Sequence, residues 1–461
     1  TTGRRLTFGG LLAGAVLVAR RLRRRVPGER FVGVMLPTSA AGAVVNIALT
    51  LLGRIPVNLN YTASETAVQS AIARCGIATV IGSRAFVAKL EDAYVPPGTV
   101  FLEDLMAHVR PLEKVAAALR GWLLPSRLHR EREWRRVGPD DLATVIFSSG
   151  STAEPKGIML SHFNVIANMA SVQMVFKFSH HDRLCGILPF FHSFGFTVTL
   201  WGPLLHGFSV SYHPNPMDGK RIGQLCRDEA LTCMVATPTF LLAYLRRARP
   251  DDFGHLRAVI TGAEKLKPKV ADSFESRFGV RPYEGYGATE LSPVAALNVA
   301  DVEIEGLKQV GHKEGSVGHP LPHVAMRVVD IDTGEALPPG ERGLLEVRGP
   351  NVMLGYLKDD ARTAQALWDG WYKTGDVATM DRDGFVFLVD RLSRYSKIAG
   401  EMVPHLAIED ALMDALGLAD PVIAVTGAPD ARKGEQIVVC FTAEAGTVDE
   451  VYAALQRCDM P

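Results

Sequence analysis

The 461-residue sequence has few cysteines, and no pattern joins them. The six cysteines form neither a CxxC motif nor a cluster with histidine, which argues against a zinc site and a disulfide framework and favours a reducing compartment. Long apolar runs are also missing, since residues 11–19 have about half the length that a bilayer span requires. Arginines within 20–25 follow this run instead of preceding it, and no A-x-A cleavage site directly follows the run. We therefore predict a helix of the folded domain, with neither a signal peptide nor a transmembrane segment.

The sequence has no excess of charge of either sign. Its 50 Lys and Arg balance 50 Asp and Glu, so nucleic acid is not predicted as a partner. Basic residues gather locally at 20–25 and 127–136. These clusters are either solvated helical faces or contacts for an acidic carrier protein or anionic lipid headgroups.

Short runs rich in valine and isoleucine alternate with helix-length segments, such as residues 162–176, over roughly the first 300 residues. The alternation predicts an α/β fold with layers of parallel sheet. Five of the runs are predicted as buried strands: residues 31–36, 78–82, 143–147, 233–236 and 258–260.

The pattern changes after about residue 315. Short strands separated by glycine, proline and aspartate turns predict a small barrel-like β region at about 315–390. The sequence from 393 onward combines a helix at 406–416 with two strands, which predicts a small α+β domain. We therefore predict a large N-terminal domain over 1–392 and a partial, mobile C-terminal domain over 393–461.

The stretch SSGSTAEPKG, residues 148–157, follows a predicted strand and precedes a predicted helix. Its hydroxyls, backbone N–H groups and lysine could converge on an anion, although the spacing is not that of P-loop NTPases. On its own the stretch is equally compatible with a turn and with a phosphate-binding loop. The candidate phosphate ligands are Ser148, Ser149, Gly150, Ser151, Thr152 and Lys156.

Seven segments in a fixed order resemble the adenylate-forming enzymes, which include acyl-CoA and acyl-carrier-protein synthetases, luciferases and the adenylation domains of peptide synthetases. The order is far more specific than any one segment. The resemblance implies ATP and Mg²⁺ as cofactors, activation of a carboxylic acid as its adenylate, and transfer to a thiol. The segments are SSGSTAEPKG, LPFFHSFG (188–195), ITGAEKL (260–266), YEGYGATE (283–290), GSVGHPLP (315–322), GWYKTGD (370–376) and DRLSRYSKIAGEMV (390–403).

The resemblance places several residues around the adenine base. Tyr286 is expected to stack on adenine, with glycines on either side that let the base approach. Taken alone, Tyr286 could equally be a core tyrosine at a strand end, and Glu264 a surface residue. The residues with an implied place beside adenine are Gly262, Ala263, Glu264, Gly285, Tyr286 and Gly287.

Other residues are implied to contact phosphate, metal and ribose. Thr289 suits a phosphate, and Glu290 suits Mg²⁺, which prefers one or two carboxylates together with phosphate oxygens. Asp376 is implied to accept hydrogen bonds from the ribose hydroxyls, and Arg391 is implied as a second ribose or phosphate contact.

Three residues have implied roles in acid binding and thiol transfer. His192 corresponds to a position beside the acyl pocket, with a core histidine as the alternative. Lys397 corresponds to a lysine that is presented for thioester formation when the C-terminal domain rotates, and Ser393 corresponds to the hinge.

Two departures from the family pattern are visible. Ala153 stands where the family usually has glycine. The family's adenylating lysine, in a Gly-Lys segment near the end of the C-terminal domain, has no counterpart here, because the last lysine is Lys433. The sequence therefore also allows a module that binds nucleotide or acyl-adenylate without turnover.

One branch resembles the sequence most at residues 53–65, 147–162 and 188–207: the acyl-acyl-carrier-protein synthetase half of bifunctional 2-acylglycerophosphoethanolamine acyltransferase/acyl-ACP synthetases. The resemblance implies a long-chain fatty acid passed to the thiol of acyl carrier protein for lysophospholipid reacylation. CoA is the alternative acceptor. It also implies a location in the cytoplasm or at the inner face of the cell membrane.

An acyltransferase half is not predicted within this sequence. Its H-x-x-x-x-D motif matches only His405 to Asp410, at the start of a predicted helix. Contact with a fused acyltransferase domain or an anionic membrane surface is left open. An apolar wall suited to an alkyl chain, or else ordinary core, is predicted from Phe190, Phe191, Phe194, Phe196, Leu200 and Trp201.

Overall fold

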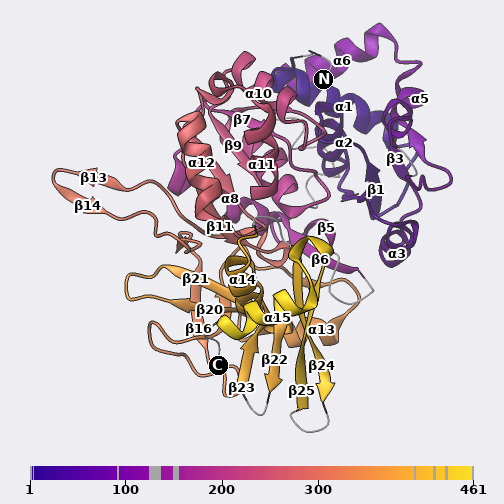
Figure 1. Cartoon of the computed structure of the whole chain (residues 1–461). Coiled ribbons are helices and arrows are strands. Elements are labelled where there is room, and N and C mark those ends of the chain that lie inside the picture. The colour runs from indigo at the N-terminus through magenta and orange to yellow at the C-terminus, as the bar shows by residue number, and fades with distance from the viewer. Residues whose placement is uncertain are drawn as a thin grey trace. The chain divides into compact units, whose positions relative to one another are not determined.

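The computed structural model divides the chain into two compact units, which are described separately (Figure 1). The first unit comprises residues 1–325 and 348–372, and the second comprises 326–347 and 373–461. The predicted domain boundary at 393 lies inside the second unit and stays a prediction. The structure describes all residues except 1, 2, 4, 91, 92, 124–136, 149–154, 399, 400, 419–421, 431–433 and 459–461, and the side chains of 122, 123, 304, 397, 401, 402 and 434.

A four-stranded parallel sheet lies near the start of the first unit, in the order β2 (Ile55–Asn58), β1 (Phe31–Met35), β3 (Val80–Gly82) and β4 (Val100–Phe101). The alternating side chains of β1 face two different layers. Val32 and Val34 pack with α1 (Phe8–Leu22) and α2 (Ala40–Leu51), whereas Met35 packs with α3 (Glu65–Cys75). Burial on both faces explains the continuous apolar run of this strand.

The second sheet of this unit has seven strands. Five parallel strands run in the order β8 (Ser209–Tyr212), β7 (Arg183–Gly186), β9 (Cys233–Ala236), β10 (Ala258–Thr261) and β11 (Pro282–Gly287), followed by antiparallel β12 (Val294–Leu297) and β15 (His319–Pro320). Side chains of α10 (Gly219–Asp228), α11 (Pro238–Arg247) and α12 (Pro268–Phe278) form one buried cluster with these strands. The prediction of α/β layers with parallel sheets is confirmed.

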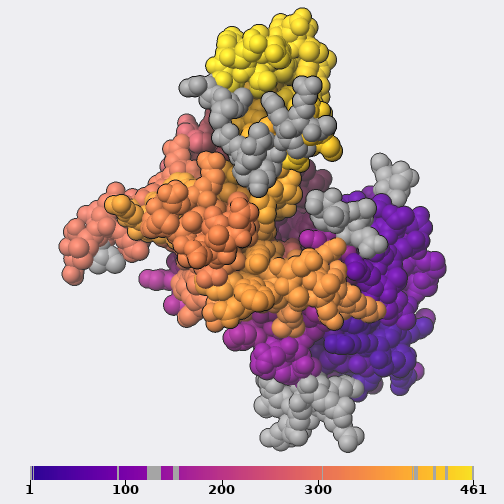
Figure 2. Space-filling model, turned by 90° about the horizontal axis from the view of Figure 1, so that it is seen from below, coloured from indigo at the N-terminus to yellow at the C-terminus, as the bar shows by residue number. Residues whose placement is uncertain are grey.

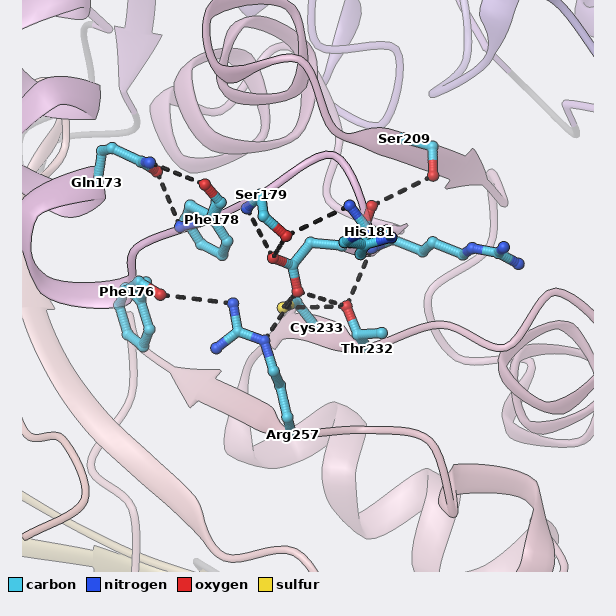
Figure 3. A network of polar contacts seen from close by, with 11 residues as sticks. Gln173, Phe176, Phe178, Ser179, His181, Ser209, Thr232, Cys233 and Arg257 are labelled. Carbon is cyan, nitrogen blue, oxygen red and sulfur yellow. Dashed lines mark hydrogen bonds and ion pairs between the residues drawn. The ribbon is translucent and has the colours of Figure 1, made fainter.

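Asp182 lies at the start of one of three neighbouring parallel strands, and Figure 3 shows its hydrogen-bond partners Ser179, Thr232 and Arg257. Asp182 Oδ1 accepts hydrogen bonds from Arg257 Nε at 2.8 Å and from Thr232 Oγ1 at 2.9 Å, and Oδ2 accepts one from Ser179 N at 2.8 Å. Although burial raises the pKa of Asp182, these hydrogen bonds and the Arg257 charge hold it well below the usual range. Asp182, Thr232 and Arg257 directly precede or adjoin β7, β9 and β10, so this carboxylate fixes the relative positions of the three strands.

The segment after the phosphate-loop stretch differs from the sequence prediction. Lys156–Ser161 form β6, which pairs antiparallel with β5 (Leu142–Ser148), and α8 (His162–Phe176) begins only after Ser161. The helix predicted at 162–176 is confirmed as α8, whereas β6 was not predicted; its alternating side chains Ile158 and Leu160 are completely buried. The stretch 148–157 therefore joins two strands, and no helix N-terminus adjoins it.

The remaining elements of the first unit are short, apart from α6. A hairpin of β13 and β14 projects from the surface, as Figures 1 and 2 both show, and Leu307 on it is 79% exposed. No helix in the described part of the chain is long and apolar enough to cross a membrane. The elements are α4 (Arg84–Val87), α5 (Leu102–Met106), α6 (Pro111–Leu123), α9 (Gly202–His206), β13 (Val302–Ile304), β14 (Leu307–Gln309), β18 (Gly355–Tyr356), α13 (Asp360–Ala366) and β19 (Leu367–Trp368).

The second unit contains two sheets. One holds β16 (Ala325–Val329), β17 (Gly343–Arg348), β20 (Trp371–Met380) and β21 (Val386–Arg391), with a few end residues assigned to the first unit. The other is antiparallel, in the order β23 (Glu401–Pro404), β22 (Tyr395–Ile398), β25 (Gly434–Phe441) and β24 (Ile423–Asp430). It packs with α14 (His405–Ala415) and α15 (Val448–Arg457) around Leu412 and Ala454.

Candidate active site

Glu290 lies in a short 3₁₀ turn, Thr289–Leu291, that follows the carboxyl end of β11. It is 9% exposed, and its Oε1 accepts a hydrogen bond from the Tyr356 hydroxyl at 2.9 Å. Burial and the Glu290 carboxylate both raise the pKa of Tyr356, so its hydroxyl remains a donor at neutral pH. The tyrosine therefore fixes the position of one oxygen of the carboxylate.

Lys156 lies on the other side of the same tyrosine. Its Nζ is 5.5 Å from the centre of the Tyr356 ring, within the range of a cation–π contact. Strand pairing explains the proximity, since Lys156 begins β6 and Tyr356 pairs with Ile158 on that strand. Lys156, Tyr356 and Glu290 thus form a row, which we call the Lys156–Glu290 row. It joins the end of the phosphate-loop stretch to the predicted metal ligand.

Three buried asparagines hold the turn that carries Glu290. Asn351 Nδ2 donates to the Leu291 carbonyl at 2.9 Å, and Asn168 Nδ2 donates to the carbonyl that begins β12 at 2.6 Å. Asn164 Nδ2 donates to two carbonyls of segment 350–352, each at 2.8 Å. Sequence reasoning missed these residues and Tyr356. The available signal was the spacing of Asn164 and Asn168, which places both asparagines on one face of a largely apolar helix.

Thr289 contacts the segment that contains His192. Ser193 Oγ lies 3.3 Å from Thr289 Oγ1, so the structure brings these two predicted motifs together. The imidazole of His192 keeps access to solvent and lies 4.5 Å from the Phe191 ring, centre to centre. Partial desolvation lowers the pKa of His192, so the ring is neutral at neutral pH.

The predicted adenine turn follows β10. Gly262 is buried, whereas Ala263 is exposed and has a φ of +70°, a left-handed conformation that costs a non-glycine residue about 1–2 kcal/mol. Glu264 Oε2 accepts hydrogen bonds from the Thr239 backbone N at 3.1 Å and hydroxyl at 2.6 Å. The carboxylate of Glu264 therefore binds the start of α11. This contact supports the alternative that Glu264 is a surface residue and does not line the adenine site.

Both glycines beside Tyr286 are required by close packing. A Cβ on Gly285 would lie 2.3 Å from the Leu297 side chain, and one on Gly287 would lie 2.1 Å from the Pro293 carbonyl. Tyr286 itself is 7% exposed. Its burial agrees with the core alternative, and stacking on adenine stays a prediction.

In the second unit, the two predicted ribose contacts are neighbours. Asp376 on β20 pairs directly with Arg391 on β21, and Arg391 Nε lies 3.3 Å from Asp376 Oδ1. Asp376 is 9% exposed and Arg391 is largely exposed, so the ion pair joins a buried carboxylate to an exposed guanidinium group on this sheet.

Lys397 lies on β22, where it pairs with Met402. Its side chain and residues 149–152 are outside the described residues, while Ser148 ends β5. Beside Lys397, buried Ser396 Oγ lies 2.9 Å from His405 Nε2. The histidine of the H-x-x-x-x-D match is therefore engaged in the interior of the second unit.

Residues 1–357 match the family model of AMP-binding enzymes. The chain belongs to the AMP-binding enzyme family. A 4-coumarate–CoA ligase-like 9 protein of Arabidopsis thaliana is 30% identical to it over 447 residues, covering 94% of this chain and 75% of the relative. A long-chain-fatty-acid–CoA ligase of Bacillus subtilis (strain 168) is 31% identical over 307 residues, covering 66% of this chain and 53% of the relative.

The solved structures agree with this assignment. ATP-bound MatB from Rhodopseudomonas palustris superposes on this AMP-binding enzyme with a TM-score of 0.80 and 26% identity, covering 100% of this chain and 89% of that chain. The predicted superfamily and fold are confirmed, and the narrower acyl-acyl-carrier-protein branch stays a prediction.

The donor set of this AMP-binding enzyme fits a Mg²⁺ that arrives with a nucleotide. Among the described residues, no group of three or more His, Cys, Asp and Glu could hold a metal ion. Glu290 instead offers a single buried carboxylate whose Oε1 is oriented by Tyr356. One carboxylate is sufficient for Mg²⁺ when phosphate oxygens and water supply the other ligands.

The candidate acyl wall lies around an element that sequence patterns do not predict. Gly195–Trp201 form a π-helix, η2, and π-helical turns occur frequently at functional sites. Phe196 and Trp201 meet edge to face with ring centres 6.1 Å apart. Phe190, Phe191, Phe196 and Leu200 are all at most 5% exposed, so their burial also agrees with ordinary core, and the pocket wall stays a prediction.

Glu284, which sequence reasoning missed, directly precedes the Gly285–Gly287 motif on β11. It lines a pocket together with Leu266, Asn298 and Lys313. Burial raises the pKa of Glu284 to about 7, partly offset by a hydrogen bond from the Leu266 backbone. A carboxyl group that titrates near neutral pH therefore lies beside the predicted adenine-binding residues.

Replacing Glu284 by glutamine is expected to make the protein more stable at pH 8, by on the order of 1–2 kcal/mol, and to change little at pH 4. The folded-state pKa is raised above the unfolded value, so the contribution of Glu284 to stability is complete below about pH 4.5 and lost as the pH rises through about 7. Chemical unfolding across this range measures the effect. The matched control, Glu303→Gln on the exposed β13, should leave the pH dependence unchanged.

Proposed function

We propose that this AMP-binding enzyme joins a carboxylic acid to a thiol through an acyl-adenylate. A carboxylate oxygen attacks the α-phosphorus of ATP and pyrophosphate leaves. A thiolate then attacks the acyl carbon, and AMP leaves. The Lys156–Glu290 row is the observation that supports this most directly, because two anions can react only where their charge is neutralised.

The first unit is proposed to bind the phosphates, Mg²⁺, adenine and the acid. Lys156 and Ser148, with Ser149, Gly150, Ser151 and Thr152, are proposed to bind the departing phosphates, and Thr289 to donate a hydrogen bond to phosphate. Glu290 is proposed to hold Mg²⁺, which when bound offsets negative charge on the phosphate oxygens. Tyr286, with the turn at 262–264, is proposed to contact adenine, and His192 to border the acid.

In the second unit, Asp376 is proposed to accept hydrogen bonds from ribose hydroxyls, with Arg391 orienting its carboxylate. Lys397 is proposed to serve the thioester step, and the Ser396–His405 hydrogen bond fixes the strand on which it lies.

We further propose a long-chain fatty acid as the acid. The name of the Bacillus subtilis relative and the apolar side chains around η2 support this class. The acceptor is proposed to be a phosphopantetheine thiol, which CoA and acyl carrier protein share. The names of the relatives favour CoA, and the motif resemblance favours acyl carrier protein. The proposed location is the cytoplasm.

The experiment offers the protein ATP, Mg²⁺ and a series of fatty and hydroxycinnamic acids, with either CoA or holo-acyl carrier protein, and measures the thioester by mass spectrometry. We expect long-chain thioester on at least one acceptor. Preference for the carrier protein would establish the narrower branch. Thioester from hydroxycinnamic acids alone would contradict the fatty-acid assignment, and no thioester from any acid would contradict the proposed function.

A further inference from the structure

The helix α6 has two apolar faces, and one of them faces solvent. Leu112, Val115 and Leu119 are 80%, 55% and 48% exposed, and their spacing places them in one stripe along the helix. The opposite face packs on α1: Ala117 is 1% exposed, and a Cβ on Gly121 would lie 3.2 Å from a backbone atom of α1. Packing within the described residues thus accounts for one apolar face of α6 and not for the other.

The first turn of α6, which carries Leu112, lies at the arginine-rich end of α1. Gly121 lies against the middle of α1, whereas Glu113 forms an ion pair with Arg21 near the end of α1, so the two helices are antiparallel (Figure 1). The start of α6 and the arginine-rich end of α1 are therefore neighbours. No acidic residue precedes Glu29 in the sequence, so this end of α1 is strongly basic. The exposed arginines here are Arg20, Arg23, Arg24 and Arg25, with Arg110 just before α6.

We propose that this surface docks the protein on an anionic lipid bilayer. The α1–α6 surface is defined by Leu112, Val115 and Leu119 together with Arg20, Arg23, Arg24 and Arg25. An apolar stripe with flanking cations suits an interfacial helix, whose side chains enter the acyl boundary while the guanidinium groups meet lipid phosphates. The proposal goes beyond the proposed function and does not depend on it, because docking requires no catalysis.

A bilayer accounts for both parts of the surface, and other partners account for only one. An acidic protein would be attracted to the arginines but would give no reason for a leucine that is 80% exposed. A second copy could cover the leucines, but a two-fold contact places the same surface of each copy together, so the two arginine groups would repel each other. An anionic bilayer presents negatively charged headgroups at its surface and apolar acyl chains directly beneath them.

The test is co-sedimentation of the full chain with vesicles of phosphatidylcholine alone or mixed with phosphatidylglycerol. We expect binding to the mixed vesicles that weakens as salt is raised, and little binding to phosphatidylcholine. The triple variant Leu112→Ser, Val115→Ser, Leu119→Ser should bind at least about a hundredfold more weakly. The quadruple variant Arg20→Gln, Arg23→Gln, Arg24→Gln, Arg25→Gln should lose roughly fivefold per arginine; Arg21 is left in place to keep its ion pair with Glu113.

Matched controls remove charge and apolar surface elsewhere. Arg246→Gln with Arg247→Gln at the exposed end of α11, and Leu307→Ser on the projecting hairpin, should bind vesicles as the parent does. Thermal unfolding by circular dichroism identifies any variant that fails to fold, and the arginine variant tests the surface independently of the leucines. Three results would overturn the proposal: equal binding by all variants, dimerisation that depends on the leucine stripe, or binding to holo-acyl carrier protein with none to mixed vesicles. Because the readout is binding, none of these results bears on the proposed reaction.

Discussion

Replacing Glu290 by glutamine is expected to lower the rate of acid-dependent adenylate formation by at least about a hundredfold while leaving the fold intact. The substitution keeps the shape of the side chain and an oxygen that can accept the Tyr356 hydrogen bond, 2.9 Å long in the parent. It removes only the negative charge, and a neutral amide is a poor ligand for Mg²⁺. The rate of acid-dependent exchange between ATP and labelled pyrophosphate measures the effect.

Two matched variants distinguish the effect of the Glu290 charge from the effect of the position of its side chain. Tyr356→Phe removes one hydrogen bond to the carboxylate but leaves the carboxylate itself, so the rate should fall only about tenfold, which corresponds to the lower end of the roughly 1.5–3 kcal/mol range of such bonds. Glu303→Gln removes an exposed carboxylate on β13, outside the proposed site, and should leave the rate within about threefold of the parent. A normal rate in the Glu290→Gln variant would show that this carboxylate does not serve the metal.

Replacing Asp182 by alanine is expected to destabilise the protein by about 3–5 kcal/mol. Asp182 is 5% exposed and receives hydrogen bonds from Arg257, Thr232 and Ser179, so its loss leaves several polar groups without their acceptor (Figure 3). Because its pKa is held below the usual range, the stabilisation is present above about pH 4 and lost as the pH falls further. Urea unfolding at several pH values measures both effects.

The control for this network is Ser209→Ala. Its hydroxyl donates a longer hydrogen bond, 3.3 Å, to the backbone carbonyl of Asp182. We expect a loss of less than about 1 kcal/mol. If Asp182→Ala were as mild as Ser209→Ala, the carboxylate would not be holding β7, β9 and β10 together.

The parallel sheets could be predicted from sequence because burial on both faces produces continuous apolar runs. The run at 233–236 coincides with β9, and the run at 31–36 nearly coincides with β1. By contrast, β6 was missed, because Gly157 to Ser161 is too short to show a period. Its pairing with β5 is decided by tertiary contacts, which bury Ile158 and Leu160 completely.

Residues of the candidate site could be predicted only where they lie together in one short segment of the sequence. Thr289 and Glu290 lie in one recognisable motif and Asp376 in another, so each could be proposed as a site residue from the sequence. Tyr356 is 66 positions away from Glu290 in the sequence, and Asn164 is 188 positions away from the carbonyl of Val352. No local pattern can pair such residues, so the groups that orient Glu290 required the structure.

The central claim is that an acid is activated at the α-phosphorus of ATP. The most direct test is a single turnover with protein in excess over an acid whose carboxylate carries ¹⁸O. Attack by this carboxylate on the α-phosphorus transfers one labelled oxygen to AMP when the thiol acceptor is added. We predict ¹⁸O in AMP and none in pyrophosphate. Unlabelled AMP, or label in inorganic phosphate formed together with ADP, would contradict the account.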